Sequence, residues 1–135
     1  EQVRCEGQKG PITALAFRPD GQMLASGGIE SSDVWLWNLP GGTVEVILPD
    51  AVAFCSVETL AWRPTGLRGT AELAVGGIDH LATGERDGEV GIWDLATRTC
   101  RHRLPGGATA IAYSPDGRWL AVAHLRHGIT IYDAD

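Results

Sequence analysis

Two histidines, His124 and His127, are three residues apart, a spacing that two ligands of one metal ion can have. They fall in a stretch that we expect to be a turn, where this spacing gives the two rings no common direction. No cysteine or carboxylate follows closely enough to complete a ligand set. We therefore interpret them as solvated turn histidines and expect no bound metal.

A second group of titratable residues lies upstream. His80 stands beside Asp79, and Glu85 and Asp87 follow, so these residue types suit general acid-base chemistry. Charged residues in a hairpin turn usually form a solvated face, and a catalytic carboxylate pair needs a cleft around it. The sequence therefore predicts a protein that is not an enzyme, with no catalytic residue and no cofactor.

The cysteines and the paired glycines suggest no further chemistry. Cys5, Cys55 and Cys100 are an odd, scattered set without the paired spacing of a disulfide framework or a zinc ribbon. Gly41-Gly42 and Gly106-Gly107 each follow a proline, but neither pair joins a strand to a helix as a phosphate-binding loop does. Small buried thiols in a reducing, cytoplasmic setting are the simplest interpretation.

Composition limits the partners. The chain has 135 residues and a net charge of −6, so no basic stripe exists to neutralise nucleic-acid phosphates or an anionic membrane surface. No apolar run approaches the length of a membrane-spanning helix. The 18 glycines, 7 prolines and 5 tryptophans suit many short strands joined by tight turns.

The elements that would carry these residues come from a repeated phrase. Residues 13–21, 58–66 and 109–117 share a pattern of alternating small and large apolar residues that ends in Pro-Asp-Gly or Pro-Thr-Gly. Its prolines are 45 and 51 residues apart, a period typical of repeat architectures. Each phrase reads as a strand and a turn, and three further short strands follow in each repeat.

These residues resemble the WD-repeat β-propeller family. The best match is the stretch 81–94, which ends in Trp93-Asp94, while the other repeats end in Trp37-Asn38 and Tyr132-Asp133. The resemblance covers essentially the whole chain and implies an all-β fold, a propeller with three four-stranded blades. We expect blade 1 at about 11–48, blade 2 at about 56–104 and blade 3 at about 108–135.

The resemblance also implies a structural hydrogen-bond network of Trp, Ser or Thr, Asp and His in each blade. The histidine is missing throughout, because Gly10-Pro11 stands where the family usually has Gly-His. Arg126 occupies the aspartate position of the third repeat, and one extra residue is expected to displace Asp33. The blades should therefore be held more by packing than by the network. The matching positions are Trp37, Ser26, Trp93, Thr83 and Asp87.

The second repeat contains about eleven extra residues within 67–85. Either 73–77 or 81–84 can serve as its second strand, and we favour an extended hairpin built on 72–78, the more apolar segment. That choice weakens the assignment of Thr83. The added loop either contacts a partner or is simply solvated.

A tentative interaction surface follows from the polar turns and one tryptophan. Trp35 stands where the family often has a polar or basic residue, so it either faces outward or packs between blades. The candidate residues are Trp35, Asp79, His80, Glu85, Arg86, His124, Arg126 and His127.

Three blades are fewer than the four to eight that close a propeller. Gln2 to Glu6 resembles a fourth strand, and the third repeat ends after its third strand, so the first segment is expected to complete a closing blade, in cis or in another copy. Met23 is the only methionine, which favours a segment of a larger polypeptide.

The sequence thus predicts a non-catalytic protein-protein interaction scaffold. Its ring would be completed by another copy, a dimer giving six blades, or by further blades of a larger chain. One alternative is a regulatory or sensor propeller of a larger signalling protein. The other is a hydrolase, which would require His80, Asp87, His124 and His127 to converge near the propeller axis.

Overall fold

The computed structural model describes residues 2–29, 31–52, 55–64, 71–80 and 87–135, and these form eleven strands. None of the described residues forms a helix that could cross a membrane. The strands are β1 (Ile12–Phe17), β2 (Met23–Gly28), β3 (Val34–Asn38), β4 (Thr43–Leu48), β5 (Ser56–Trp62), β6 (Glu72–Ile78), β7 (Gly88–Asp94), β8 (Thr99–Pro105), β9 (Ala108–Tyr113), β10 (Trp119–His124) and β11 (Gly128–Asp133).

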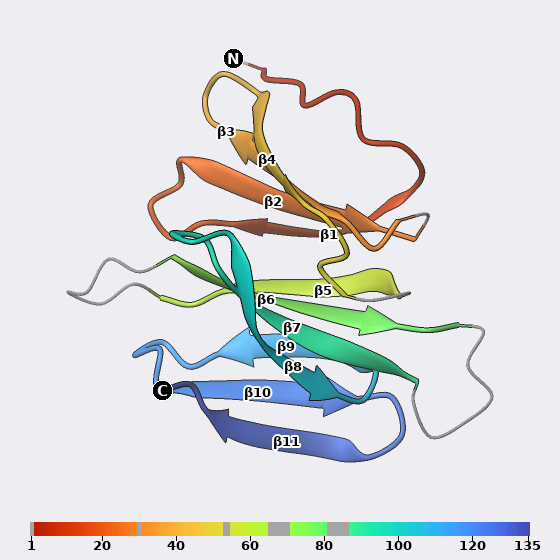
Figure 1. Cartoon of the computed structure of the whole chain (residues 1–135). Coiled ribbons are helices and arrows are strands. Elements are labelled where there is room, and N and C mark those ends of the chain that lie inside the picture. The colour runs from red at the N-terminus through yellow and green to blue at the C-terminus, as the bar shows by residue number, and fades with distance from the viewer. Residues whose placement is uncertain (1, 30, 53–54, 65–70, 81–86) are drawn as a thin grey trace.

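The strands form three antiparallel sheets in chain order. Blade 1 is β1-β2-β3-β4, blade 2 is β5-β6-β7-β8, and blade 3 is β9-β10-β11. Blade 2 lies between the other two, and the three sheets follow one another along the molecule (Figure 1). The architecture is the all-β arrangement of blades that the repeats predict.

The first and third repeated phrases end their strands in the same way. Gly21 and Gly117 adopt positive φ angles of 73° and 72°, which glycine reaches without a steric penalty. Asp20 and Asp116 each accept a backbone N–H two residues further on. The hydrogen bond to Arg18, together with this N–H, lowers the pKa of Asp20 below its ordinary value. The turn chemistry thus closes the first hairpin of blades 1 and 3 alike.

Each blade has two different faces, because side chains alternate along a strand. One face carries what we call the alanine row, two alanines and one larger aliphatic residue paired across the first three strands. We call this side the row face. The rows are Ala16-Ala25-Leu36 in blade 1, Ala61-Ala74-Ile92 in blade 2 and Ala112-Ala121-Ile131 in blade 3.

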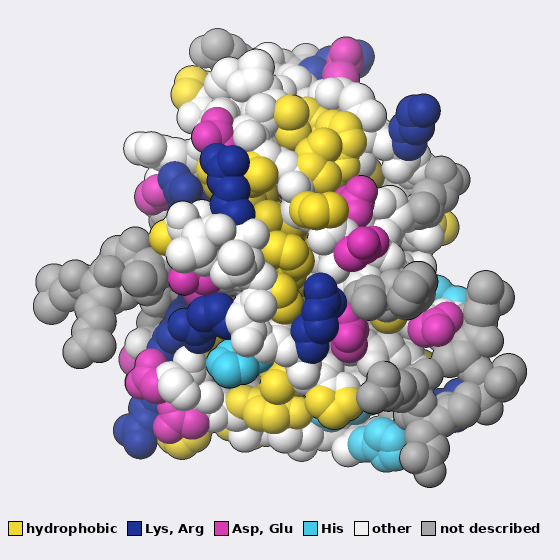
Figure 2. All heavy atoms as spheres, in the orientation of Figure 1, with side chains coloured by type: hydrophobic (Ala, Val, Ile, Leu, Met, Phe, Trp, Pro, Cys, Tyr) yellow, Lys and Arg dark blue, Asp and Glu magenta, His cyan; other side chains and the backbone are white. Residues whose placement is uncertain are grey.

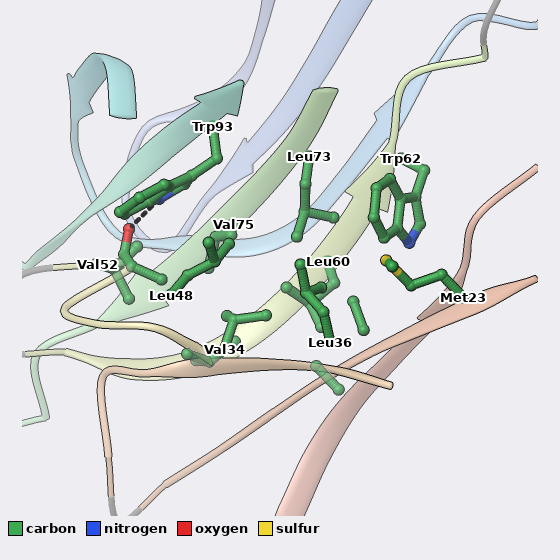
Figure 3. Packing of buried hydrophobic residues seen from close by; sticks show 14 of the residues in the cluster. Met23, Val34, Leu36, Leu48, Val52, Leu60, Trp62, Leu73, Val75 and Trp93 are labelled. Atoms are coloured by element: carbon green, nitrogen blue, oxygen red, sulfur yellow. Dashed lines mark hydrogen bonds between the residues drawn. The ribbon is translucent and has the colours of Figure 1, made fainter. Parts of the chain in front are cut away.

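The opposite side, the aromatic face, carries Phe17, Trp62 or Tyr113 at the end of the first strand. The row face of blade 1 packs against the aromatic face of blade 2 in the larger buried cluster. Figure 3 shows Trp62 beside Met23, with Leu36 and Leu60 meeting between the sheets. The small alanines leave room for the ring, so the two sheets pack closely.

The junction between blades 2 and 3 repeats this arrangement. Ala74 and Ile92 of blade 2 pack with Ile111 and Leu120 of blade 3 in a second buried cluster, and Tyr113 lies against its edge. Both junctions therefore pair a row face with an aromatic face in the same order.

The insertion in blade 2 adopts the extended hairpin. Its second strand is Glu72–Ile78, and all seven residues of this strand are buried. Residues 81–86, the alternative second strand included, lie outside the described residues.

The N-terminal segment departs from the expectation. Residues 2–9 form no strand, and Gln2 to Glu6 does not complete blade 3 within this chain. It runs along blade 1 instead, since a Cβ built on Gly42 would lie 2.7 Å from the Arg4 carbonyl oxygen. The prediction of closure in cis is wrong because blade 3 lies beyond blade 2, at the other end of the molecule (Figure 1).

Close packing between blades 1 and 2 requires a glycine at position 27. A Cβ built there would lie 2.4 Å from Val57 Cγ1, so Gly27→Ala forces the two sheets apart. We expect a loss of about 1–3 kcal/mol in the free energy of unfolding, measured by urea denaturation followed by circular dichroism. Gly41→Ala is the matched control, because its nearest neighbour would be Thr43 Oγ1 at 3.8 Å. Equal stabilities of the two variants would contradict the packing argument.

Candidate interaction surface

Blade 1 contains a chain of three polar side chains, of which Trp37 and Ser26 are buried and Gln8 is half-buried. The Trp37 indole donates from Nε1 to Ser26 Oγ over 2.8 Å, and Ser26 Oγ donates in turn to Gln8 Oε1. Gln8 also returns a hydrogen bond from Nε2 to the Ser26 carbonyl over 3.3 Å. The structure thus brings Trp37 and Ser26 together and adds Gln8, which sequence reasoning missed.

Gln8 therefore occupies the network position where the family usually has histidine. The assignment of that position to Gly10-Pro11 is wrong. Backbone geometry supports the position of Gln8, because in every blade the residue just before the equivalent position has a positive φ. The pairs are Gly7-Gln8, Asp50-Ala51 and Gly106-Gly107, with φ values of 123°, 48° and 105° at their first members. Gly7-Gln8 in the sequence is the signal that could have identified the position.

Blade 2 uses its backbone where blade 1 uses side chains. Trp93 Nε1 donates to the Ala51 carbonyl oxygen over 3.0 Å, a bond drawn dashed in Figure 3. Because Leu73 pairs with Trp93 as Leu24 pairs with Trp37, Val75 occupies the position of Ser26 and offers no hydroxyl. The predicted link from Trp93 to a serine or threonine is therefore replaced, and Thr83 lies outside the described residues.

The turn aspartates hold the connection that leads into the next blade. Asp87 is buried and accepts the Gly107 N–H at Oδ1 over 2.6 Å. Asp33 accepts the Asp50 N–H over 2.9 Å, so it bonds the connection to the next blade as Asp87 does. These bonds tie blade 1 to blade 2 and blade 2 to blade 3.

The histidines make separate contacts. His80 Nε2 lies 2.8 Å from Glu58 Oε1, whereas His124 Nε2 lies 3.0 Å from Thr130 Oγ1 within blade 3. His127 is exposed in the β10–β11 turn. Within the described ranges, no three His, Cys, Asp or Glu side chains are grouped so as to hold a metal ion.

Of the other candidates, Asp79 and Arg126 both lie against Asp87, whereas Trp35 lies in blade 1. Trp35 is half-buried, with its ring 5.5 Å from that of Trp37, and it also lies against Gly7. The Asp79 N–H donates to the Asp87 carbonyl, and Arg126 Nε lies 3.8 Å from Asp87 Oδ2. Glu85 and Arg86 lie outside the described residues. The tentative surface is therefore not one patch, and its role in binding stays a prediction.

A buried carboxylate between blades 2 and 3 is already fully engaged. Glu72 accepts the Tyr113 hydroxyl at Oε2 over 2.8 Å, and Arg101 and Arg63 lie 2.7 and 3.6 Å from its oxygens. Burial, and then the charge of Glu72, raises the pKa of Tyr113 above its ordinary value. A cavity of about 240 Å³ opens beside this group, but these charges compensate one another and serve the junction.

The aromatic face of blade 1 is open around Phe17 and Leu15, unlike the equivalent parts of the other blades, whereas Trp37 on the same face is buried. Phe17 is 65% exposed, whereas Trp62, at the same position of blade 2, is 7% exposed. Leu15 and Leu60 show the same contrast. The difference is one of position in the molecule, because blade 1 covers blade 2 and no described residue of blade 3 covers blade 1.

The row face of blade 3 is open at the other end. Ile131 is 57% exposed, whereas the equivalent Leu36 and Ile92 are 0% and 6% exposed. Ala112, Trp119, Ala121 and Ile131 line a shallow, mainly apolar hollow there together with Tyr113 and Ser114. In Figure 2, hydrophobic side chains are also visible on the viewed side, interspersed with charged ones. At these two end faces, apolar side chains are exposed at positions where the equivalent side chains of the neighbouring blades are buried.

The family follows from the repeated blade and its network. A family model described as "WD domain, G-beta repeat" matches residues 1–38 and 98–133, more than half of the chain. The chain belongs to the WD-repeat family. This WD-repeat chain is similar to a chain in the crystal structure of the mitotic checkpoint complex, with a TM-score of 0.72 and 21% sequence identity. The similarity covers 92% of the WD-repeat chain and 38% of the other chain. At this identity the likeness shows the fold.

Curated relatives are similar over most of the WD-repeat chain. Periodic tryptophan protein 2 homolog of Schizosaccharomyces pombe is 24% identical over 125 residues, which is 90% of the chain and 13% of that protein. Human angio-associated migratory cell protein is 32% identical over 100 residues, 73% of the chain and 23% of that protein. Centriole proteome protein 16 of Chlamydomonas reinhardtii is 26% identical over 138 residues, 98% of the chain and 6% of that protein. The chain spans less than a quarter of the length of each.

Removing the central hydroxyl of the blade 1 network tests its contribution. Ser26→Ala leaves Trp37 Nε1 and Gln8 Oε1 without their buried partner. We expect a loss of about 1–3 kcal/mol in the free energy of unfolding, measured by urea denaturation. The control Thr97→Ala changes an exposed hydroxyl and should stay within about 0.5 kcal/mol of the parent chain. A Ser26→Ala chain as stable as this control would show that packing alone holds blade 1.

Cys55 is predicted to resist alkylation. Burial, followed by the charges of Glu89 and Asp79, raises the pKa of its thiol from 9.0 to about 11. The thiolate, the reactive form, is therefore about a hundredfold scarcer at pH 8 than for an ordinary thiol. Iodoacetamide labelling followed by peptide mass mapping should show Cys55 modified at least that much more slowly in the native chain than in guanidinium. Equal rates under the two conditions would disprove the assignment of Cys55 as a buried packing residue.

Proposed function

We propose that this WD-repeat chain is a non-catalytic scaffold for protein-protein interaction whose two end faces bind further blade-like protein surfaces. Another copy, or further blades of a larger chain, would complete the ring. One observation carries the proposal: positions that a neighbouring blade covers inside the chain are open at both ends. Phe17 and Ile131 are exposed, while Trp62, Leu36 and Ile92 are buried.

The energetic argument is direct. Covering one large apolar side chain contributes roughly 1.5–3 kcal/mol. Leu15 and Phe17 are exposed at one end, and Ile129 and Ile131 at the other, so each face offers a substantial apolar area in a chain that already folds in blades. An apolar surface of this kind, surrounded by polar groups, is typical of a protein interaction site.

The setting and the relatives support a protein partner. The mitotic checkpoint complex is, by its name, an assembly, so a similar fold serves there among other proteins. Cys5, Cys55 and Cys100 form no disulfide within the described part of the chain, which supports a reducing, cytoplasmic location.

Cysteine labelling tests the proposal without a known partner. Phe17→Cys and Ile131→Cys should react slowly with a maleimide when the intact protein is labelled in its own cells, because both faces are covered there. His127→Cys, in an exposed turn of blade 3, is the control and should react rapidly. Peptide mass mapping separates these sites from the native cysteines. Labelling at 17 and 131 as fast as at 127 would refute the scaffold proposal.

A further inference from the structure

A groove lies between blades 1 and 2, where β4 of blade 1 faces the turn between β7 and β8 of blade 2. Its volume is about 270 Å³. Both of these blades have all four strands and pack directly against each other, so the groove is separate from the two end faces. Figure 2 shows hydrophobic side chains between the two blades, with Lys or Arg side chains next to them.

The floor of this groove is apolar and continuous with the core. Leu36 and Met23 are buried beneath it, whereas Val46 and Leu95 are half-buried at the surface of the same cluster. An apolar side chain of a partner that covers Val46 and Leu95 would remove this surface from water and extend the contact between the blades.

The equivalent place between blades 2 and 3 carries different side chains. Glu72 stands where blade 1 has Met23, and Arg101 stands where it has Glu45, at the same bulge of the fourth strand. Glu72 and Arg101 are 2.7 Å apart, so the charges at that junction are engaged with one another. A methionine in place of the glutamate prevents this pairing in the first groove and leaves its floor apolar.

The charges around the first groove are not paired across it. Glu45, on the blade 1 side, accepts Asn38 Nδ2 over 2.6 Å, and Arg18 pairs with Asp20 over 2.8 Å. Arg98 lines the blade 2 side and is exposed. It forms no ion pair with any other residue that the structure describes. The guanidinium of Arg98 is therefore available to a carboxylate from outside.

The backbone of Arg98 also departs from the ordinary. Its φ is 57°, a value that residues with a Cβ seldom adopt. The equivalent residue between β3 and β4 is Gly42, with a φ of 73°, so this turn suits a glycine and an arginine there lowers stability. Backbone strain of this kind is concentrated at binding sites, which points to a role for the Arg98 side chain.

We propose that this groove docks a peptide segment of a protein partner in which a large apolar side chain stands next to an aspartate or glutamate. The apolar side chain lies on Val46 and Leu95, and the carboxylate accepts charge-assisted hydrogen bonds from Arg98. The inference rests on the proposed function only in taking a protein as the partner. The net charge of −6 gives no general attraction for an acidic peptide, so binding depends on this local contact.

Selection from a phage library of random peptides tests the proposal. The library is first depleted on immobilised Arg98→Glu and then selected on the parent chain, so the retained peptides need the groove. We expect them to contain Asp or Glu next to Leu, Ile, Met or Phe. A synthetic peptide from this set should bind Arg98→Glu about tenfold or more weakly than the parent by fluorescence polarisation.

Lys9→Glu is the matched control for charge. Lys9 is exposed and precedes β1, whereas the groove lies near the other end of that strand, so the variant should bind the peptide as the parent does. Replacing the apolar residue of the peptide by serine should weaken binding, because Val46 and Leu95 then stay in water.

Arg98→Gly separates binding from folding. It introduces the residue that the equivalent turn of blade 1 carries, so it should unfold at a urea concentration no lower than the parent does, yet bind the peptide as weakly as Arg98→Glu. Selected peptides without the acidic and apolar pair, parental binding by Arg98→Gly, or equal binding of the serine peptide would each overturn the proposal. The labelling of positions 17 and 131 is independent of these results, so the scaffold proposal and this one can fail separately.

Discussion

The close approach of neighbouring sheets over a row of small side chains is the contact on which the rest of this structure depends. A ring lies close to the sheet where the opposing residues are small, as at Ala16 and Ala25 beside Trp62. Glycine serves the same end at Gly27, where Val57 occupies the space of a side chain. Two junctions of this kind bury most of the core, and the same geometry leaves a complementary face at each end.

Polar bonds vary from blade to blade while this packing is retained. Blade 1 holds its tryptophan through Ser26 and Gln8, whereas blade 2 holds Trp93 through a backbone carbonyl. Both solutions satisfy a buried indole N–H, which would otherwise lower stability. The network is therefore one of several ways to fix the connection between blades, and packing supplies the common frame.

Much of the fold could be predicted from the sequence, because repeated turns and apolar alternation are local signals. The strand Glu72–Ile78 belongs to this class, whereas the pairing of Trp37 with Ser26 was implied by the resemblance to the WD-repeat family. The role of Gln8 was missed because its bond joins residues 18 apart, and Asp50 adopts the positive φ of a glycine without being one. The path of the N-terminal segment also depends on where the blades lie in space.

The candidate site was less predictable for a related reason. Polar turn residues such as His80 and His124 attract attention in a sequence, but here each has a local partner. Leu15, Phe17 and Ile131 look like ordinary core residues, and only the absence of a described neighbour distinguishes them. Exposure is a property of the arrangement, so no single repeat reveals it.

The difference between Trp62 and Tyr113 has a consequence for the order of the blades. Tyr113 needs the carboxylate of Glu72, while Trp62 needs only a carbonyl oxygen and the thioether-lined space beside Met23. Exchanging blades 2 and 3 would set the phenol of Tyr113 against Met23 and the indole of Trp62 against Trp119, and Glu72 would lose the hydroxyl that it accepts. Although the blades share one template, the side chains at their junctions make each a specific neighbour of the next, and the template cannot be shuffled freely.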